Sequence, residues 1–421
     1  MSHKKRLIEN ISSLFVLQAA NYVLPMVTIP YLVRVLGPDK FGLIAFAQAF
    51  IQYFIILSDY GFNLSATRQI AIHRDDPTAI SDIFSAVMSV KLGLMLIGFV
   101  VMSVIVLLIP RFHANMALYH ILFLTVLSNV LFPIWLFQGM ERMKYVTVLS
   151  LIARSISLIA IFLFVHKESD YLLAAAAQPA GLALSGVLAL FSIKRLTRLH
   201  LNIPSRQSLR KALDEGWHVF LSTAAISLYT TSSAFILGLI AGNTAVGYFS
   251  GADKICKAIQ GLFSPISQAI YPHISNLVSK SKEDALAFIR KSLKWIGIGS
   301  LMASIALFAF ASPLVVLILG DKFLPAVNIL RCMAFLPFIV ALSNVFGMQT
   351  MLTFGMNKAF SKIIIISGLI NLILIVPLTC KFGAEGTAIS VLITEIIVTV
   401  SMGAALQKSG FHLFRLRKSS W

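Results

Sequence analysis

Apolar segments, each about as long as a lipid bilayer is thick, follow one another through almost the whole chain. A transmembrane helix needs about 20 mostly apolar residues to cross a hydrocarbon core of about 30 Å. The segments that meet this requirement are residues 11–33, 41–62, 82–109, 115–137, 146–166, 171–193, 217–241, 247–275, 293–318, 326–352, 361–380 and 386–407. Only 12% of the 421 residues are charged, against about 25% in soluble domains. The sequence therefore predicts an all-α integral membrane protein with twelve transmembrane helices and no separate soluble catalytic domain.

The basic residues are distributed unevenly between the predicted connections. The chain carries 35 Lys and Arg against 17 Asp and Glu, a net charge of +18. In a soluble protein this excess would suggest a nucleic-acid partner. Here 24 basic residues fall at the termini, in the even-numbered connections or, for Lys294 and Lys362, at the second position of the span that follows such a connection, whereas 6 fall in the odd-numbered connections. Cytoplasmic loops carry the excess of Lys and Arg in membrane proteins. We therefore expect both termini in the cytoplasm, and we expect no nucleic-acid partner.

The two halves of the sequence resemble each other. The matching segments are Gly37-x4-Gly42-x4-Ala47 with Gly242-x4-Gly247-x4-Ala252, Leu127-Ser128-Asn129-Val130 with Leu342-Ser343-Asn344-Val345, and Gly139-Met140 with Gly355-Met356. Chance similarity is the alternative, but three matches in the same order favour duplication. Parallel repeats of this kind recur among transporters. We expect two six-helix lobes, residues 1–200 and residues 201–421, around a central cavity.

Polar residues form stripes on predicted helices. Positions on an ideal helix turn by about 100° per residue, which aligns two sets: Gln48, Gln52, Asp59 and Asn63 in the first half, and Asp253, Lys257, Gln260, Ser264, Gln268 and Tyr271, with Lys254 at the margin, in the second. A charge at the bilayer centre costs at least ~2.5–3.5 kcal/mol, so such stripes should avoid lipid. They could form a sealed core in which Asp253 pairs with Lys257, or line a water-filled cavity. Stripes on several spans with more bases than acids favour the cavity.

Four further charged residues within or beside the spans are candidate site residues. Lys91 and Arg154 lie too deep to reach the interface easily, so each could equally face the cavity or the core. Glu395 is either a hydrogen-bonded core acid or a proton site. Arg34 closes the first span beside the repeated Gly-Pro turn, where it could serve as an interfacial anchor.

Motifs of the common enzyme classes are missing. Residues 37–42 resemble a phosphate-binding loop but lack its Lys-Ser/Thr, and no zinc-protease, Cys-x-x-Cys or Gly-x-Ser-x-Gly pattern occurs. Three cysteines without metal-ligand spacing predict neither a zinc site nor a disulfide framework. We expect a protein that is not an enzyme and binds no metal or cofactor. A membrane-embedded glycan polymerase or ligase would need a large outer loop, which the chain lacks.

Several motifs are similar to those of one transporter family. They are Arg34-Val35-Leu36-Gly37-Pro38, Asp59-Tyr60-Gly61-Phe62-Asn63-Leu64-Ser65-Ala66-Thr67-Arg68, Phe137-Gln138-Gly139-Met140-Glu141-Arg142-Met143-Lys144, Glu215-Gly216-Trp217-x-x-Phe220-Leu221-Ser222, Val246-Gly247-Tyr248-Phe249 and Pro265-Ile266-Ser267-Gln268-Ala269-Ile270-Tyr271-Pro272. The chain resembles the Wzx-type flippases of O-antigen and polysaccharide repeat units, the polysaccharide transporters of the multidrug/oligosaccharidyl-lipid/polysaccharide flippase superfamily. One departure is Gly251-Ala252-Asp253-Lys254, where the family more often has Ala-Glu-Lys/Arg.

The resemblance implies a substrate and a location. The substrate is an undecaprenyl-diphosphate-linked oligosaccharide, moved by alternating access from the cytoplasmic to the periplasmic leaflet of a bacterial inner membrane. The implied partners are membrane lipids, a coupling proton or sodium ion, and a glycan polymerase with its chain-length regulator. A cation-coupled multidrug exporter of the same superfamily is the nearest alternative, although its cavity should favour acids over bases.

This substrate gives the polar residues expected roles. A diphosphate needs cationic groups, because burying its charge in a dry interior would cost on the order of tens of kcal/mol. The expected phosphate or cavity cations are Lys254, Lys257, Arg34, Arg68, Arg154 and Lys91. The expected sugar-binding amides are Gln48, Gln52, Asn63, Gln260 and Gln268. Asp59, Asp253 and Glu395 are the expected ion-coupling acids.

Overall fold

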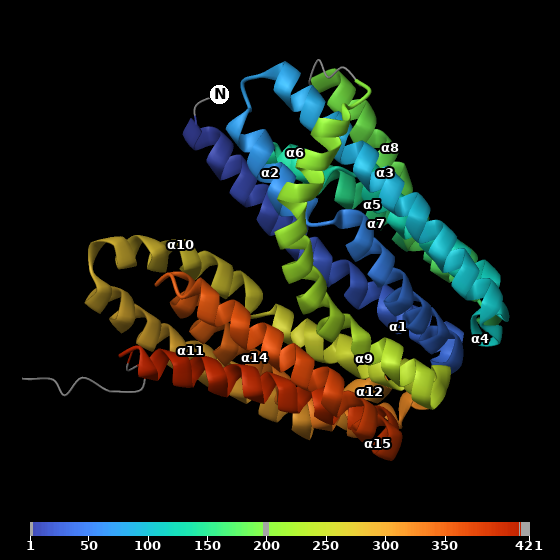
Figure 1. Ribbon diagram of the computed structural model, residues 1–421. Coiled ribbons are helices and arrows are strands. Elements are labelled where there is room, and N and C mark those ends of the chain that lie inside the picture. The colour runs from blue at the N-terminus through green and yellow to red at the C-terminus, as the bar shows by residue number, and fades with distance from the viewer. Residues whose placement is uncertain (1–2, 197–201, 412, 414–421) are drawn as a thin grey trace, which may run out of the picture. The chain divides into compact units, whose positions relative to one another are not determined.

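The computed structural model describes residues 3–196, 202–411 and 413, and its regular structure in these ranges is helical. In lipid every backbone N–H and C=O must be satisfied within the segment, and helices meet this requirement. Chain contacts divide the protein into two units, residues 1–235 (unit 1) and residues 236–421 (unit 2), coloured blue to green and yellow-green to red in Figure 1. Nine helices or helical runs of the described part are long and apolar enough to cross a membrane, which makes this a multi-pass membrane protein.

The described part of unit 1 holds eight α-helices, the first part of a ninth and a short 3-10 helix (Glu168–Asp170). The α-helices are α1 (His3–Asp59), α2 (Phe62–Ile72), α3 (Pro77–Leu108), α4 (Pro110–His113), α5 (Met116–Leu131), α6 (Ile134–Gly139), α7 (Met143–Phe164), α8 (Tyr171–Leu196) and α9 (Arg206–Gly261), which continues into unit 2. The predicted spans 82–109, 146–166 and 171–193 correspond closely to α3, α7 and α8. The predicted span 115–137 is divided between α5 and α6, because Pro133 cannot continue a helix and pushes Phe132 out of the helical region.

Unit 2 holds the rest of α9 and the helices that follow. They are α10 (Ser264–Lys280), α11 (Lys282–Ala309), α12 (Ala311–Leu319), α13 (Ala326–Met333), α14 (Leu336–Asn344), a π-helix (Val345–Leu352) and α15 (Asn357–Lys408). In this unit α11 packs on α14, while α13, α14 and the π-helix pack on α15 (Figure 1).

Three very long helices are each interrupted by one glycine. Gly37 in α1 has φ 67° and ψ 175°, and Gly242 in α9 has φ 84° and ψ 179°. Gly383 interrupts α15 with another conformation, φ 56° and ψ −132°. Positive φ is accessible to glycine without a steric cost. Gly37 and Gly242 are matched positions of the internal repeat, and they bend the chain with nearly the same backbone conformation.

Small residues hold the helices of unit 1 together. A Cβ at Gly181 of α8 would lie 2.3 Å from the Ala153 carbonyl oxygen of α7, so the two backbones touch. Ser157 donates across the same interface to the Ala177 carbonyl, at 2.9 Å, and Ser185 to the Leu149 carbonyl, at 2.7 Å. In a membrane the lipid tails are as apolar as the side chains, so the hydrophobic effect does not drive helices together. Helices associate there through close backbone packing and hydroxyl hydrogen bonds. These contacts fix the helical frame on which the polar residues of unit 1 lie.

Candidate functional site

A polar cluster around the buried Lys91 joins four helices of unit 1. The Lys91 ammonium of α3 donates to Asp59 Oδ1 at the end of α1, at 2.9 Å, and to Asn129 Oδ1 of α5, at 3.3 Å. The second carboxylate oxygen of Asp59 accepts from Asn63 Nδ2 of α2, at 2.8 Å. The Lys91 side chain is 1% exposed and the Asp59 side chain 23%. Lys91, for which the sequence left both core and cavity open, is buried in this structure.

The local backbone explains why Asp59 and Asn63 meet. Helix α1 ends at Asp59, and the next two residues have positive φ, 45° at Tyr60 and 76° at Gly61. Helix α2 begins directly after this turn, at Phe62, which places the Asn63 amide within hydrogen-bonding distance of the Asp59 carboxylate. Gly61 is required here twice, since a Cβ would also lie 2.7 Å from Val219. The turn lies in the sequence motif that begins at Asp59.

The polar face of unit 2 has a different character. On α9, Lys257 Nζ lies 2.7 Å from Asp253 Oδ2, an i,i+4 pair on one helix. The Lys257 side chain is nevertheless 64% exposed, and Lys254 is also exposed. Gln260 is half-buried and donates to the Cys256 sulfur at 3.4 Å. The pair named in the sealed-core alternative therefore forms, but it is not sealed: both lysines keep accessible surface within an apolar helix.

The predicted stripe over residues 253–271 does not lie on one continuous helix. Helix α9 ends at Gly261 and α10 begins at Ser264, with Pro265 in its first turn. Proline cannot donate a backbone hydrogen bond within a helix but is well accommodated at its start. The predicted span 247–275 is therefore divided between α9 and α10, and the alignment of the stripe on one helix holds only from Asp253 to Gln260. The Gln268 side chain lies outside the described part of the structure.

The remaining predicted residues are spread over several helices. Arg34, Gln48 and Arg68 are exposed, whereas Gln52, Arg154 and Glu395 are half-buried. Glu395 lies in α15, and its carboxylate makes no ion pair or hydrogen bond with the residues that the structure describes. Two groups of predicted residues meet directly, one in each unit: Asp59, Asn63 and Lys91 in unit 1, and Asp253 and Lys257 in unit 2.

Sequence reasoning missed two polar contributors in unit 1. Asn129 completes the shell of Lys91, and its signal was present, because Asn129 lies in the repeated Leu-Ser-Asn-Val motif. The Tyr53 hydroxyl of α1 forms a 2.9 Å hydrogen bond with Ser232 of α9. These residues are 179 positions apart in the sequence, and no local pattern connects them. In the described residues no group of three or more His, Cys, Asp or Glu is arranged to hold a metal ion.

The fold is shared with solved transporter structures. The chain superposes with a TM-score of 0.75 on the lipid II flippase MurJ in an inward closed conformation, covering 96% of this chain and 89% of that one at 14% identity. It superposes with a TM-score of 0.72 on an inward-facing multidrug resistance MATE family transporter of the MOP superfamily, covering 98% and 100% at 14% identity. At this identity the likeness concerns the fold alone.

Sequence comparison gives closer relatives. Residues 7–278 match the family described as polysaccharide biosynthesis protein. An Escherichia coli (strain K12) protein named "Putative O-antigen transporter" is 40% identical over 401 residues, which are 95% of this chain and 97% of that protein. A Shigella dysenteriae protein of the same name is 29% identical over 399 residues, 95% and 100% of the two chains. The similarity to Wzx-type transporters is thereby confirmed, and the chain belongs to the polysaccharide biosynthesis protein family.

Proposed function

We propose that this protein is a flippase that moves an undecaprenyl-diphosphate-linked oligosaccharide from the cytoplasmic to the periplasmic leaflet of a bacterial inner membrane. The observation that carries the proposal is the cationic face of α9, where Lys254 and Lys257 are exposed within a candidate membrane span. Exposed ammonium groups are costly in hydrocarbon, but they suit an anionic cargo. Family membership and the relatives' names support a glycan as that cargo.

The proposed substrate chemistry follows from these side chains. A Lys ammonium is a point charge that can neutralise a phosphate oxygen, and an Arg guanidinium can bind two oxygens at once. We assign the diphosphate to Lys254 and Lys257, with Arg34, Arg68 and Arg154 contributing positive potential. The amides Gln48, Gln52, Asn63, Gln260 and Gln268 are proposed to bind sugar hydroxyls. The apolar lipid tail can stay in the bilayer throughout.

Lys91 receives a different role. Its amine is surrounded by Asp59 and Asn129 at hydrogen-bonding distance, so it would have to abandon both to bind a phosphate. Leaving the largely buried Asp59 carboxylate without its cation is costly. We therefore propose that Lys91 and Asp59 fasten α1, α3 and α5 to one another.

Proposed coupling rests on the acids. Asp59 and Asp253 are each engaged by a lysine in this structure, whereas Glu395 is half-buried in α15 and without a partner among the described residues. We assign coupling to a proton or sodium gradient first to Glu395. Transport by Glu395→Gln should lose its dependence on the imposed gradient while retaining a basal rate. Unchanged gradient dependence would remove Glu395 from the mechanism.

The proposed transport cycle is alternating access between two six-helix lobes around a central cavity, with both termini in the cytoplasm. The partners are membrane lipids and, downstream, a glycan polymerase with its chain-length regulator. No catalytic step is proposed.

The decisive experiment compares two substrates in one preparation. Purified protein in proteoliposomes should translocate undecaprenyl-diphosphate-linked oligosaccharide, measured by the accessibility of the glycan to an external lectin. A cationic dye should not be moved by the same vesicles. Dye transport without glycan transport would favour a cation-coupled multidrug exporter and would overturn the proposal.

A further inference from the structure

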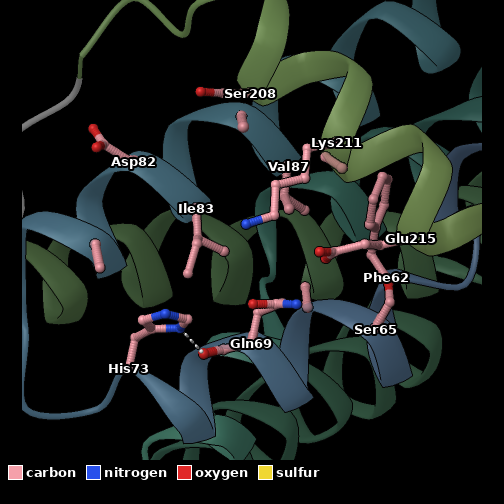
Figure 2. A pocket seen from close by; sticks show the side chains of 14 residues that line it. Phe62, Ser65, Gln69, His73, Asp82, Ile83, Val87, Ser208, Lys211 and Glu215 are labelled. Atoms are coloured by element: carbon pink, nitrogen blue, oxygen red, sulfur yellow. Dashed lines mark hydrogen bonds between the residues drawn. The ribbon is translucent and has the colours of Figure 1, made fainter.

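Unit 1 contains a cavity that belongs to neither polar cluster. It has a volume of about 260 Å³ and lies between α2, the first turns of α3 and the first turns of α9 (Figure 2). Its apolar walls include Phe62, Ile83 and Val87. Ligand pockets measure about 300–1,000 Å³, so a cavity of this size suits a small polar group.

Two opposite charges enter this cavity from α9. Lys211 and Glu215 are one helical turn apart, a spacing at which such residues commonly form an ion pair. The described residues contain no ion pair between them, and Figure 2 shows both side chains reaching into the cavity. The residues one position earlier do form an ion pair, outside the cavity. The Arg210 Nε atom lies 3.9 Å from Asp214 Oδ2, and the two side chains are 86% and 74% exposed. Lys211 and Glu215 therefore offer their charges to the cavity rather than to each other.

Helices α2 and α3 provide a complementary set of groups. Gln69 and His73 line the α2 side, where the His73 Nδ1 atom lies 3.0 Å from the Gln69 carbonyl oxygen and the second ring nitrogen stays free of that contact (Figure 2). Asp82 of α3 lies at the rim and accepts a hydrogen bond from Asn202 at 3.2 Å. The lining thus holds two carboxylates, one lysine and one histidine. A diphosphate would require an excess of cations, whereas this balance suits a ligand carrying both signs of charge.

The depth of the cavity indicates where such a ligand comes from. Its walls are built from the ends of two candidate membrane spans, Leu24–Ile72 and Pro77–Leu108. Lipid headgroups occupy this level of a bilayer. At the rim, Asn202 is tied to Asp82 and Ser85, and the next residue, Ile203, is 99% exposed. An exposed isoleucine beside a polar cavity suits an amphipathic molecule whose apolar part continues into the membrane.

We propose that this cavity is a binding site for a phosphoethanolamine group, with the phosphate at Lys211 and His73 and the ammonium at Glu215. The depth of the site favours the headgroup of a zwitterionic phospholipid over a soluble phosphoethanolamine. An occupied site would fasten the start of α9 to α2 and α3. The proposal is independent of the flippase function, since the ligand and the site both differ from the cargo and the α9 lysines.

The test is lipid retention by the full-length protein, measured by native mass spectrometry after release from nanodiscs. Nanodiscs would contain equal amounts of phosphatidylethanolamine and phosphatidylglycerol with the same acyl chains. Wild type should retain phosphatidylethanolamine in preference, and Lys211→Ala or Glu215→Gln should each reduce retention at least tenfold. The matched controls Arg210→Ala and Asp214→Asn make the same charge changes one position earlier and should retain it as wild type does.

Two further arms keep the result interpretable. The exchange variant Lys211→Glu/Glu215→Lys keeps both charges and should recover part of the retention, which separates ligand binding from misfolding. If the protein binds glycerophosphoethanolamine but retains no phospholipid, the site still recognises a phosphoethanolamine group, and its ligand is a soluble molecule and not a membrane lipid. Equal retention of phosphatidylglycerol, or wild-type retention by the Lys211 and Glu215 variants, would overturn the proposal.

Discussion

Lys91 and Asp59 connect separate helices of unit 1, whereas Lys257 and Asp253 lie one turn apart on a single helix of unit 2. Both pairs are short, 2.9 Å and 2.7 Å. The two lysines differ in surroundings: the Lys91 side chain is 1% exposed and is also bonded to Asn129, and the Lys257 side chain is 64% exposed. The acids are alike, each 23% exposed. The same two residue types thus make a fastening in one unit and an accessible cation in the other.

This difference teaches that a charge inside an apolar span is not by itself a ligand site. A buried pair is strongly coupled to stability, because removing one partner leaves the other charge without compensation. An exposed pair contributes little to stability and can exchange its partner for a ligand at low cost. Substitution of the buried lysine should therefore lower stability, whereas substitution of the exposed lysine should lower transport with little loss of stability.

Breaking the buried pair should have the largest effect. Lys91→Met leaves Asp59 and the Asn129 amide without their cation, and we expect a loss of about 3 kcal/mol, at the low end of the ~3–5 kcal/mol typical of such changes because Asp59 keeps some exposure. Equilibrium unfolding in detergent measures it. The double variant Lys91→Met/Asp59→Asn should be less destabilised than the single one. An unfolding midpoint unchanged in Lys91→Met would mean that the pair does not fasten the helices.

Removing the exposed lysine should cost much less stability. Lys257→Ala breaks a pair on the surface of one helix, and we expect a change below ~1 kcal/mol in the same unfolding experiment. A loss as large as that of Lys91→Met would erase the distinction between the two units.

Removing only the acid of the exposed pair should have a smaller effect. Asp253→Asn keeps the shape and leaves Lys257 in place, so we expect ~0.3–0.5 kcal/mol, the usual value of an i,i+4 pair. Glycan transport should be largely retained, because the cation that faces the cargo remains. Complete loss of transport in a folded Asp253→Asn protein would give this acid a direct part in the mechanism.

We expect the smallest effect on stability from a carboxylate outside the spans, Asp76. Asp76 caps α3 by accepting from the Thr78 and Ala79 amides, at 2.9 and 3.1 Å, and from the Thr78 hydroxyl, at 2.6 Å. The Thr78 hydroxyl bond, first, and the Ala79 amide bond lower the pKa of Asp76 below its ordinary 3.8. A lowered folded-state pKa gives stability that is present above the unfolded pKa and is lost as the pH falls through the folded pKa.

Asp76→Asn should accordingly lower the melting temperature slightly at pH 7 and have almost no effect below the folded pKa of Asp76, where the wild-type carboxyl is also neutral. Melting curves of the two proteins at both pH values measure this difference. A variant effect that is equal at pH 7 and at the lowest pH would show that the charge of the cap is not what stabilises the helix.

Much of the helical frame could be predicted from the sequence, because apolar length alone determines where a helix can span. The spans predicted at 82–109, 146–166 and 171–193 coincide with α3, α7 and α8. Repeat matching also singled out Gly37 and Gly242, which bend their helices alike.

The failures have a common physical cause. The helical spacing of polar residues continues through Gly261–Ser264, although the helix itself is interrupted there. Polar spacing does not report a missing backbone hydrogen bond, and only Pro265 indicated the break. The partners of Lys91 come from two other helices, and the cavity is formed by α2, α3 and a segment more than a hundred residues later. Such contacts depend on tertiary packing, which a hydrophobic pattern along the sequence does not report. The number of spans and the lobe boundary at residue 200 stay predictions.

The central claim is that the exposed lysines of α9, and not the buried lysine of unit 1, serve the anionic cargo. The most direct measurement is the initial rate of undecaprenyl-diphosphate-linked glycan translocation by Lys254→Ala/Lys257→Ala in proteoliposomes, at a folded fraction matched to wild type. We predict that the rate falls at least tenfold while the unfolding midpoint stays close to that of wild type. A double variant that translocates the glycan at the wild-type rate would contradict the account.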